Sequence, residues 1–291
     1  MIFIHETLQR SKIWHTASMR IVTLTWARNE EDILEHFLRH TATFAQEMHI
    51  MLHMSRDGSL QIASSLQRQG LPIRIGMDEG VAHRQASALT ELVKALPIEE
   101  DDWVVPLDAD ELLQSSVNIR DAIAALPTDT PTAVPWKTYL PTHRDDPAEK
   151  NPIKRITHRR SIETPQYHKM IIPGSLIRHS NCKILPGNHA VALGDELLHS
   201  TPTSALWIAH FPVRTEAQLR RKIIQGWQSV LANPQRIPGE GFHWEQLYSR
   251  CLDPRPIDTA EISRIARDYA QTNGALTELV SDPLHTSLAV A

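Results

Sequence analysis

Three acidic residues directly follow a short apolar run in the stretch DDWVVPLDADELL. The apolar run, residues 103–107, has the length of a buried strand, and Asp108, Asp110 and Glu111 stand where that strand would leave its sheet. Carboxylates are preferred ligands of hard cations, and open α/β sheets bind ligands at the carboxyl ends of their strands. We therefore interpret Asp108 and Asp110 as ligands of one metal ion. The alternative is a solvated acidic loop.

Two of the 16 histidines stand in contexts that suit a further metal ligand. His189 ends the turn sequence PGNH, which would hold its imidazole on a rigid loop. His210 ends the apolar run LWIAH, as Asp108 ends its own apolar run. Either histidine is a candidate, and for each of them the alternative is a structural or surface role.

Basic residues that could neutralise a diphosphate form a second set. Arg214 closely follows His210, and Lys222 lies one helical turn before Gly226 in an expected helix. The glycine leaves one face of that helix open, at a cost of ~1 kcal/mol relative to alanine. Arg84, in the sequence HRQ, is a third candidate. The alternative for these residues is a solvated cationic face.

Strands and helices that could position these residues alternate in the first half of the chain. The expected strands are residues 20–26, 48–54, 73–75 and 103–107, and the expected helices are residues 30–41, 60–69 and 86–96. Asn29 is expected to cap the first helix, with acidic residues in its first turn. This alternation predicts an α/β fold with a mostly parallel sheet and right-handed crossovers.

The pattern of alternating strands and helices ends at about residue 126. Prolines punctuate short strands such as residues 133–140, which indicates a mixed second half that receives the second substrate. Helical periodicity returns at residues 216–230 and again over residues 258–280.

Composition restricts the class of protein. The chain has 291 residues, 41% of them hydrophobic and 22% charged, as expected for a soluble globular protein. Its formal net charge of -4 provides no general reason to expect nucleic acid as a partner. The two cysteines, Cys182 and Cys251, suggest a reducing compartment. There is no run of 18 apolar residues and no signal-peptide pattern. We therefore predict a cytoplasmic protein.

The first 18 residues mix apolar with basic side chains. We expect them to form a flexible N-terminal extension that makes at most peripheral contact with a membrane. Met19 could be the true start of the domain.

Four segments, taken in order, resemble bacterial glycosyltransferases of the family 2 type, which have the GT-A fold. They are ARNEE after the first strand, SRDGS after the second, LDADEL at the acidic residues, and IAHFPVR followed by Lys222 and Gly226. The resemblance covers about residues 19–227. It implies a Rossmann-like, mostly parallel sheet flanked by helices, a mixed acceptor-side second half and a helical C-terminal tail.

The resemblance also implies a division of the chain. Residues 19–232 would form the GT-A domain, with residues 19–126 as its nucleotide-sugar half and residues 127–232 as its acceptor half. Residues 233–291 would form a helical C-terminal extension.

Roles for individual residues follow from the same resemblance. The donor would be a nucleotide sugar of the UDP or GDP class. The residues implied to contact it are Ala27, Arg28, Glu30, Asp57, Arg84, Asp108, Arg214 and Lys222. Asp108 and Asp110 would hold Mn²⁺ or Mg²⁺ on the diphosphate, with Asp110 as the more direct ligand and either His189 or His210 completing the site. The sequence SRD at Asp57 is less acidic than in many relatives, so the preferred nucleobase stays open.

The implied reaction is direct displacement by an acceptor hydroxyl, with inversion, on a glycan or lipid-linked acceptor of polysaccharide biosynthesis. A carboxylate must accept the proton of that hydroxyl within hydrogen-bond reach. Asp195 and Glu196 follow the PGNH turn, and Glu245 is the other option. Of these, we predict Asp195 as the base.

Three other functions compete with this interpretation. A nucleotidyltransferase would usually carry a glycine-rich loop after its first strand, where this chain reads WARNEE. A phosphatase of the haloacid-dehalogenase type carries its Asp-x-Asp pair after the first core strand, whereas here the pair comes late. A non-catalytic sugar- or nucleotide-binding module on the same fold stays open.

Overall fold

The computed structural model describes residues 19–270 and 277–284. The N-terminal segment 1–18, for which we predicted a flexible extension and peripheral membrane contact, lies outside the described residues. Within the described ranges, no helix is both long enough and apolar enough to span a bilayer.

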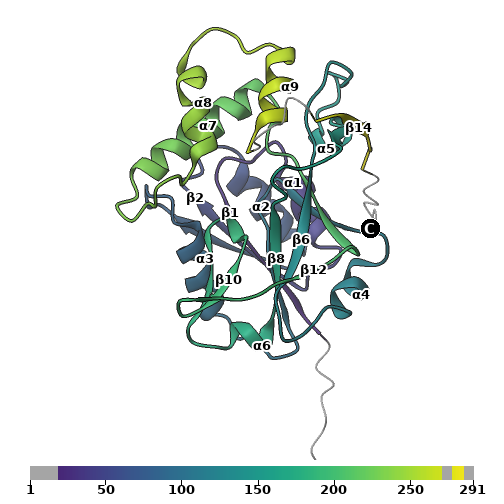
Figure 1. The fold of residues 1–291 in the computed structure, drawn as a ribbon, viewed down its shortest axis with the longest axis vertical. Coiled ribbons are helices and arrows are strands. Elements are labelled where there is room, and N and C mark those ends of the chain that lie inside the picture. The colour runs from purple at the N-terminus through teal and green to yellow at the C-terminus, as the bar shows by residue number, and fades with distance from the viewer. Residues whose placement is uncertain (1–18, 271–276, 285–291) are drawn as a thin grey trace, which may run out of the picture.

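Strands and helices alternate through the first half of the chain, as predicted (Figure 1). The elements are β1 (Ile21–Ala27), α1 (Leu34–Thr41), β2 (Glu47–His53), α2 (Ser59–Arg68), β3 (Ile73–Asp78), α3 (Gln85–Lys94) and β4 (Trp103–Pro106). The four strands pair in parallel in the order β3-β2-β1-β4. The prediction of a mostly parallel sheet flanked by helices is therefore confirmed.

The second half adds shorter elements. They are β5 (Glu111–Ser115), α4 (Ile119–Ala124), β6 (Thr132–Thr138), α5 (Pro152–Arg155), β7 (His158–Arg160), β8 (His168–Pro173), α6 (Gly174–Ile177), β9 (Cys182–Ile184), the 3-10 turn η1 (Pro186–Asn188), β10 (Val191–Leu193), β11 (Glu196–Leu197), β12 (Thr201–Pro202) and β13 (Leu206–His210). The sheet continues beyond β4 in the order β8-β6-β13-β5, and β12 pairs with β6. Strand β8 is antiparallel to both of its neighbours, which makes this part of the sheet mixed.

Both faces of the sheet are covered, because successive residues of β1 point to opposite sides and all of them are buried. Ile21 packs in the cluster that contains Leu34 and Phe37 of α1. Val22 packs on the other side, in the cluster that contains Leu89 of α3. The two-sided burial explains why the strands read as continuous apolar runs.

A separate layer of helices comes from the last third of the chain. It comprises α7 (Glu216–Leu231), α8 (Phe242–Leu252) and α9 (Thr259–Asp268), which Figure 1 shows grouped at one end of the molecule. Leu219 and Ile223 of α7 pack with Cys251 of α8 and Ile265 of α9. This layer places residues from the last third of the chain beside the carboxyl ends of the parallel strands.

Two local predictions were wrong. Asn29 does not cap α1: its backbone is left-handed, with φ 55°, and the N-cap is Ile33. The side chain of Asn29 is committed elsewhere, since its Oδ1 accepts from the Arg56 N–H and its Nδ2 donates to Gln225. The helical pattern predicted over 258–280 holds for α9, which ends at Asp268, but not for β14 (Leu279–Ser281), which pairs antiparallel with β7.

Candidate functional site

The acidic turn that follows β4 is held between two strands. The backbone N–H of Asp108 donates to the Glu111 carboxylate at 3.0 Å, and the N–H of Glu111 donates back to the Asp108 carbonyl at 3.0 Å. The N–H of Phe211 donates to the carbonyl of Asp110 at 2.8 Å. Because β5 and β13 pair antiparallel with Glu111 opposite His210, that histidine lies beside the turn.

Asp108 is held by two side chains that sequence reasoning missed. Gln85 Nε2 donates to one carboxylate oxygen at 2.5 Å, and Lys169 Nζ donates to the other at 2.7 Å. Lys169 is buried in β8, where it also contacts Glu111 at 3.3 Å and donates to the Gly187 carbonyl. Burial raises the pKa of Glu111 to about 8, although Lys169 opposes that shift. A lysine inside the apolar run of β8 was the available sequence signal.

Asp110 is buried and faces three cationic or basic groups. Lys222 Nζ lies 2.5 Å from its Oδ2, Arg214 Nη1 lies 3.8 Å from it, and His210 Nε2 lies 3.9 Å from it. Burial by itself would raise the pKa of Asp110, but Lys222 and the other two groups hold it well below its usual range. Asp110 is therefore ionised at neutral pH.

Arg214 lies behind the turn and has no exposed side-chain surface. Its guanidinium forms ion pairs with Glu30 and with Asp32, the latter at 2.8 Å. These contacts tie the loop after β1 to the segment after β13. Arg214 thus holds the loops in place and lines neither of the two cavities described below.

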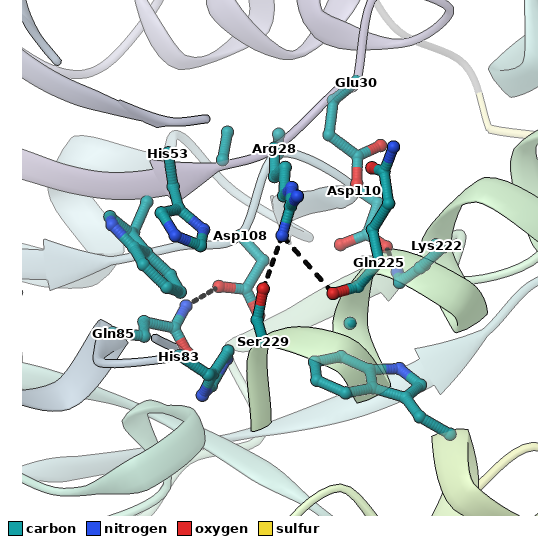
Figure 2. A pocket seen from close by; sticks show the side chains of 15 residues that line it. Arg28, Glu30, His53, His83, Gln85, Asp108, Asp110, Lys222, Gln225 and Ser229 are labelled. Carbon is teal, nitrogen blue, oxygen red and sulfur yellow. Dashed lines mark hydrogen bonds and ion pairs between the residues drawn. The ribbon is translucent and has the colours of Figure 1, made fainter. Parts of the chain in front are cut away.

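A small cavity of about 140 Å³ lies beside the turn, at the carboxyl ends of the parallel strands (Figure 2). Its wall includes Trp26, whose ring stacks on His53 with centroids 4.2 Å apart. Arg28 reaches across it to Ser229 Oγ at 2.5 Å and to the Gln225 carbonyl at 3.3 Å. The parallel register aligns the ends of β1 and β2 and so places Trp26 beside His53, whereas Gln225 and Ser229 belong to α7.

A large cavity of about 420 Å³ shares Asp108, Asp110 and Lys222 with the small cavity. His189 and His210 both line it. His189 Nδ1 lies 2.7 Å from the carbonyl of His168, so this nitrogen carries the proton. Burial lowers the pKa of His189 to about 4 and holds that of His210 well below its ordinary value, so both imidazoles are neutral at pH 7.

Eight of the twelve predicted site residues line at least one of these two cavities, and four, including Arg214, do not. Those lining one or both cavities are Ala27, Arg28, Glu30, Asp108, Asp110, His189, His210 and Lys222. Asp57 lines neither cavity, because its carboxylate accepts from the backbone N–H groups of Glu31 and Ser59. Arg84 lines neither and pairs with Asp78 at 3.2 Å.

Asp195 also lines neither cavity. Asp195 lies in the turn between β10 and β11, where its side chain is fully exposed and forms an ion pair with Lys183 at 3.4 Å. The alternatives Glu196 and Glu245 are exposed as well and line neither cavity. Sequence proximity to the PGNH turn therefore did not translate into proximity to the acidic turn.

We predicted that Gly226 would leave one face of α7 open. In the structure, an aromatic side chain fills the space beside this glycine. A Cβ at this position would lie 2.8 Å from the ring of Trp244, which lines both cavities. Trp244 Nε1 in turn donates to the Tyr269 hydroxyl at 3.0 Å. The glycine thus permits close packing of α7 and α8 at the rim of the site.

Residues 19–270 and 277–284 do not by themselves form a complete metal site, since no group of three or more His, Cys, Asp or Glu side chains among them could hold an ion. Mg²⁺ usually binds through one or two carboxylates and takes its other ligands from phosphates and water. Asp108 and Asp110, which line both cavities, fit that pattern.

No protein-family model matches the chain, and no curated protein matches it. Its structure is similar to that of a mannosyltransferase from Pyrobaculum calidifontis in complex with GDP-Man and Mn²⁺, at 15% identity over 80% of this chain and 70% of that chain, with a TM-score of 0.42. A putative glucose-1-phosphate thymidylyltransferase from Bacillus anthracis in complex with a sucrose matches at 11% identity over 93% of this chain and 92% of that chain, with a TM-score of 0.32. A 4-diphosphocytidyl-2C-methyl-D-erythritol synthase matches at 13% identity over 55% of this chain and 77% of that chain, with a TM-score of 0.30. The matched structures thus include both glycosyltransferases and nucleotidyltransferases.

Proposed function

We propose that the protein is a metal-dependent glycosyltransferase, which moves a sugar from a nucleotide-sugar donor to an acceptor hydroxyl. One observation carries the proposal: Asp108 and Asp110 line the small and the large cavity at once. A transfer reaction needs two substrates whose reacting atoms meet about 3–3.5 Å apart. Two cavities that share an acidic turn supply that arrangement.

The donor nucleotide would enter from the small cavity. Trp26 and His53 form a stacked pair at one side of it, while Ala27 and Glu30 line it near the loop after β1. These groups suit a nucleobase and a ribose of the UDP or GDP class. Because Arg28 crosses the cavity to Ser229, donor binding would require its guanidinium to turn toward the diphosphate.

Charge at the acidic turn suits a leaving diphosphate. Mn²⁺ or Mg²⁺ held by Asp108 and Asp110 would supply positive charge against the phosphate oxygens when bound. Lys222 and Arg28 belong to the protein and add two cationic groups at the same cavity. Cations that are already in position stabilise the charge that develops on the leaving diphosphate, and they do not have to move during the reaction.

Attack by the acceptor hydroxyl from the opposite side would invert the sugar's anomeric centre. A base for this step has to line the large cavity, because the acceptor oxygen must meet the donor sugar there. The support for Asp195 as the base comes from sequence alone, since its carboxylate is exposed and lines neither cavity.

A screen of UDP- and GDP-sugars for binding and for slow hydrolysis, with and without Mn²⁺, tests the proposal. We expect at least one donor to bind, with binding strengthened by Mn²⁺ and weakened in Asp110→Asn. Asp129→Asn is the matched control, because it removes the same charge at an exposed position that lines neither cavity. If no nucleotide sugar binds the folded protein, or Asp110→Asn behaves as Asp129→Asn does, the proposal is wrong.

A second assay, for pyrophosphate release, distinguishes a nucleotidyltransferase. Such an enzyme would combine a nucleoside triphosphate with a sugar 1-phosphate and release pyrophosphate. Pyrophosphate release that depends on both compounds would replace the proposed function with that one.

A further inference from the structure

Aromatic side chains supply much of the wall of the large cavity. Trp136 and Tyr167 lie on one part of the wall, and Phe242, Trp244 and Tyr269 on another. Trp136 and Tyr167 contact each other with ring centroids 5.2 Å apart, so their positions are mutually fixed. Aromatic rings offer large apolar surfaces, and Trp and Tyr add a polar group at one edge. Such a wall suits a ligand that has both an apolar face and hydroxyl groups.

The second part of this wall comes from the C-terminal segment, residues 233–270. Phe242 and Trp244 belong to α8, and Tyr269 directly follows α9. Gly226 of α7 fixes the depth of the Trp244 ring, and the Tyr269 hydroxyl accepts its indole N–H. Residues of the segment that we predicted as a C-terminal extension therefore line the large cavity.

One polar group of the wall is ready to orient a hydroxyl. His189 Nδ1 donates to the His168 carbonyl at 2.7 Å, which leaves Nε2 as a hydrogen-bond acceptor. No hydrogen bond engages Nε2 within the part of the chain that the structure describes. The ring is held edge-on to Trp136, with centroids 5.3 Å apart, and beside Tyr167 at 5.2 Å. Its orientation is therefore fixed before any ligand binds.

We propose that the large cavity holds a single terminal sugar ring of the acceptor, walled by Tyr167 and the C-terminal segment and oriented by His189 Nε2. This inference rests on the proposed function, because it names the acceptor for the same acidic turn. The volume of about 420 Å³ is within the ~300–1,000 Å³ range of small-molecule sites. The sugar hydroxyl that reaches Asp108 and Asp110 would be the one that is glycosylated.

Saturation-transfer NMR and titration calorimetry with a panel of methyl hexosides test this inference, using the full chain with and without UDP and GDP. We expect at least one methyl hexoside to bind. Tyr167→Leu removes one aromatic face of the cavity and should weaken the affinity for that hexoside roughly 2- to 10-fold. His189→Phe removes one hydrogen bond to the hexoside and should weaken its affinity by a similar factor. Tyr248→Leu is the matched control, because Tyr248 lies on α8 and lines neither cavity.

Octyl phosphate is the competing probe, since it represents an apolar chain instead of a sugar ring. The inference is overturned if octyl phosphate binds the cavity and no methyl hexoside does, or if Tyr167→Leu and Tyr248→Leu weaken binding equally. It is also overturned if no methyl hexoside binds a folded protein that binds nucleotide sugars. That last result would leave the proposed function intact, whereas loss of all nucleotide-sugar binding would refute the proposed function itself.

Discussion

Lys222 of α7 and Asp110 of the acidic turn form an ion pair across 112 residues of sequence, with Nζ 2.5 Å from Oδ2. The carboxylate has 3% of its side-chain surface exposed and the lysine 19%. The pair connects the helical layer to the end of β4. It also places a cation at a carboxylate that we propose as a metal ligand.

Replacing Lys222 by methionine should therefore destabilise the fold. Removing one partner of a buried pair leaves an uncompensated charge, which costs about 3–5 kcal/mol. We expect the lower end of that range, because the charged guanidinium of Arg214 stays 3.8 Å from the Asp110 carboxylate. Urea denaturation measures the loss, and the double variant Lys222→Met/Asp110→Asn should recover most of it. Arg221→Met, at a more exposed neighbouring pair, should cost at most about 1 kcal/mol. Equal losses for the two single variants would contradict this account.

Gly226→Ala should lower stability although alanine favours helices. The added Cβ would lie 2.8 Å from the Trp244 ring, and overpacking of this kind costs about 1–3 kcal/mol. The gain in helix propensity, about 1 kcal/mol, offsets part of that cost. Chemical denaturation should show a net loss and a shifted tryptophan emission. Gln228→Ala, on an exposed position of the same helix, is the control and should change stability by about 0.5 kcal/mol or less. A stabilised Gly226→Ala variant would show that Trp244 moves freely.

Acid should destabilise the protein in part through His243. Burial lowers the pKa of His243 to about 3, below the unfolded value of about 6.5. The unfolded state then binds more protons between these values, so this histidine's contribution is complete above pH 6.5 and is lost as the pH falls toward 3. His243→Asn should make the fall of unfolding free energy shallower in that window, by up to about 1.4 kcal/mol per pH unit. Gln246→Asn, at an exposed position of the same helix, is the control and should leave the slope unchanged, and an unchanged slope in His243→Asn would be evidence against the prediction.

Arg28→Met should weaken donor binding without unfolding the protein. If its guanidinium binds the diphosphate, the lost charge-assisted hydrogen bonds amount to about 1.5–3 kcal/mol, or roughly 10- to 100-fold in affinity. Calorimetry with the donor found in the screen measures the change. Arg56→Met is the control, because Arg56 is exposed and pairs with Glu79. Similar affinities for both variants would exclude Arg28 from the donor site.

Local patterns in the sequence predicted the alternating strands and helices and the place of the acidic turn. They could do so because apolar periodicity and strand length are properties of neighbouring residues. Local reasoning failed at Asn29, whose side chain bonds to Arg56 and Gln225 instead of capping α1. It also failed at Leu279–Ser281, where pairing with β7 overrides a helical pattern.

Only the tertiary structure decided which groups face the two aspartates. Lys169 is 61 residues from Asp108, and Lys222 is 112 residues from Asp110. Pairing of β8 beside β4 and packing of α7 over the turn bring these lysines into contact, and neither depends on nearby sequence. The same packing left Asp57 and Asp195 outside both cavities. Residue types thus indicated the chemistry, whereas strand order and helix packing determined which residues can take part in it.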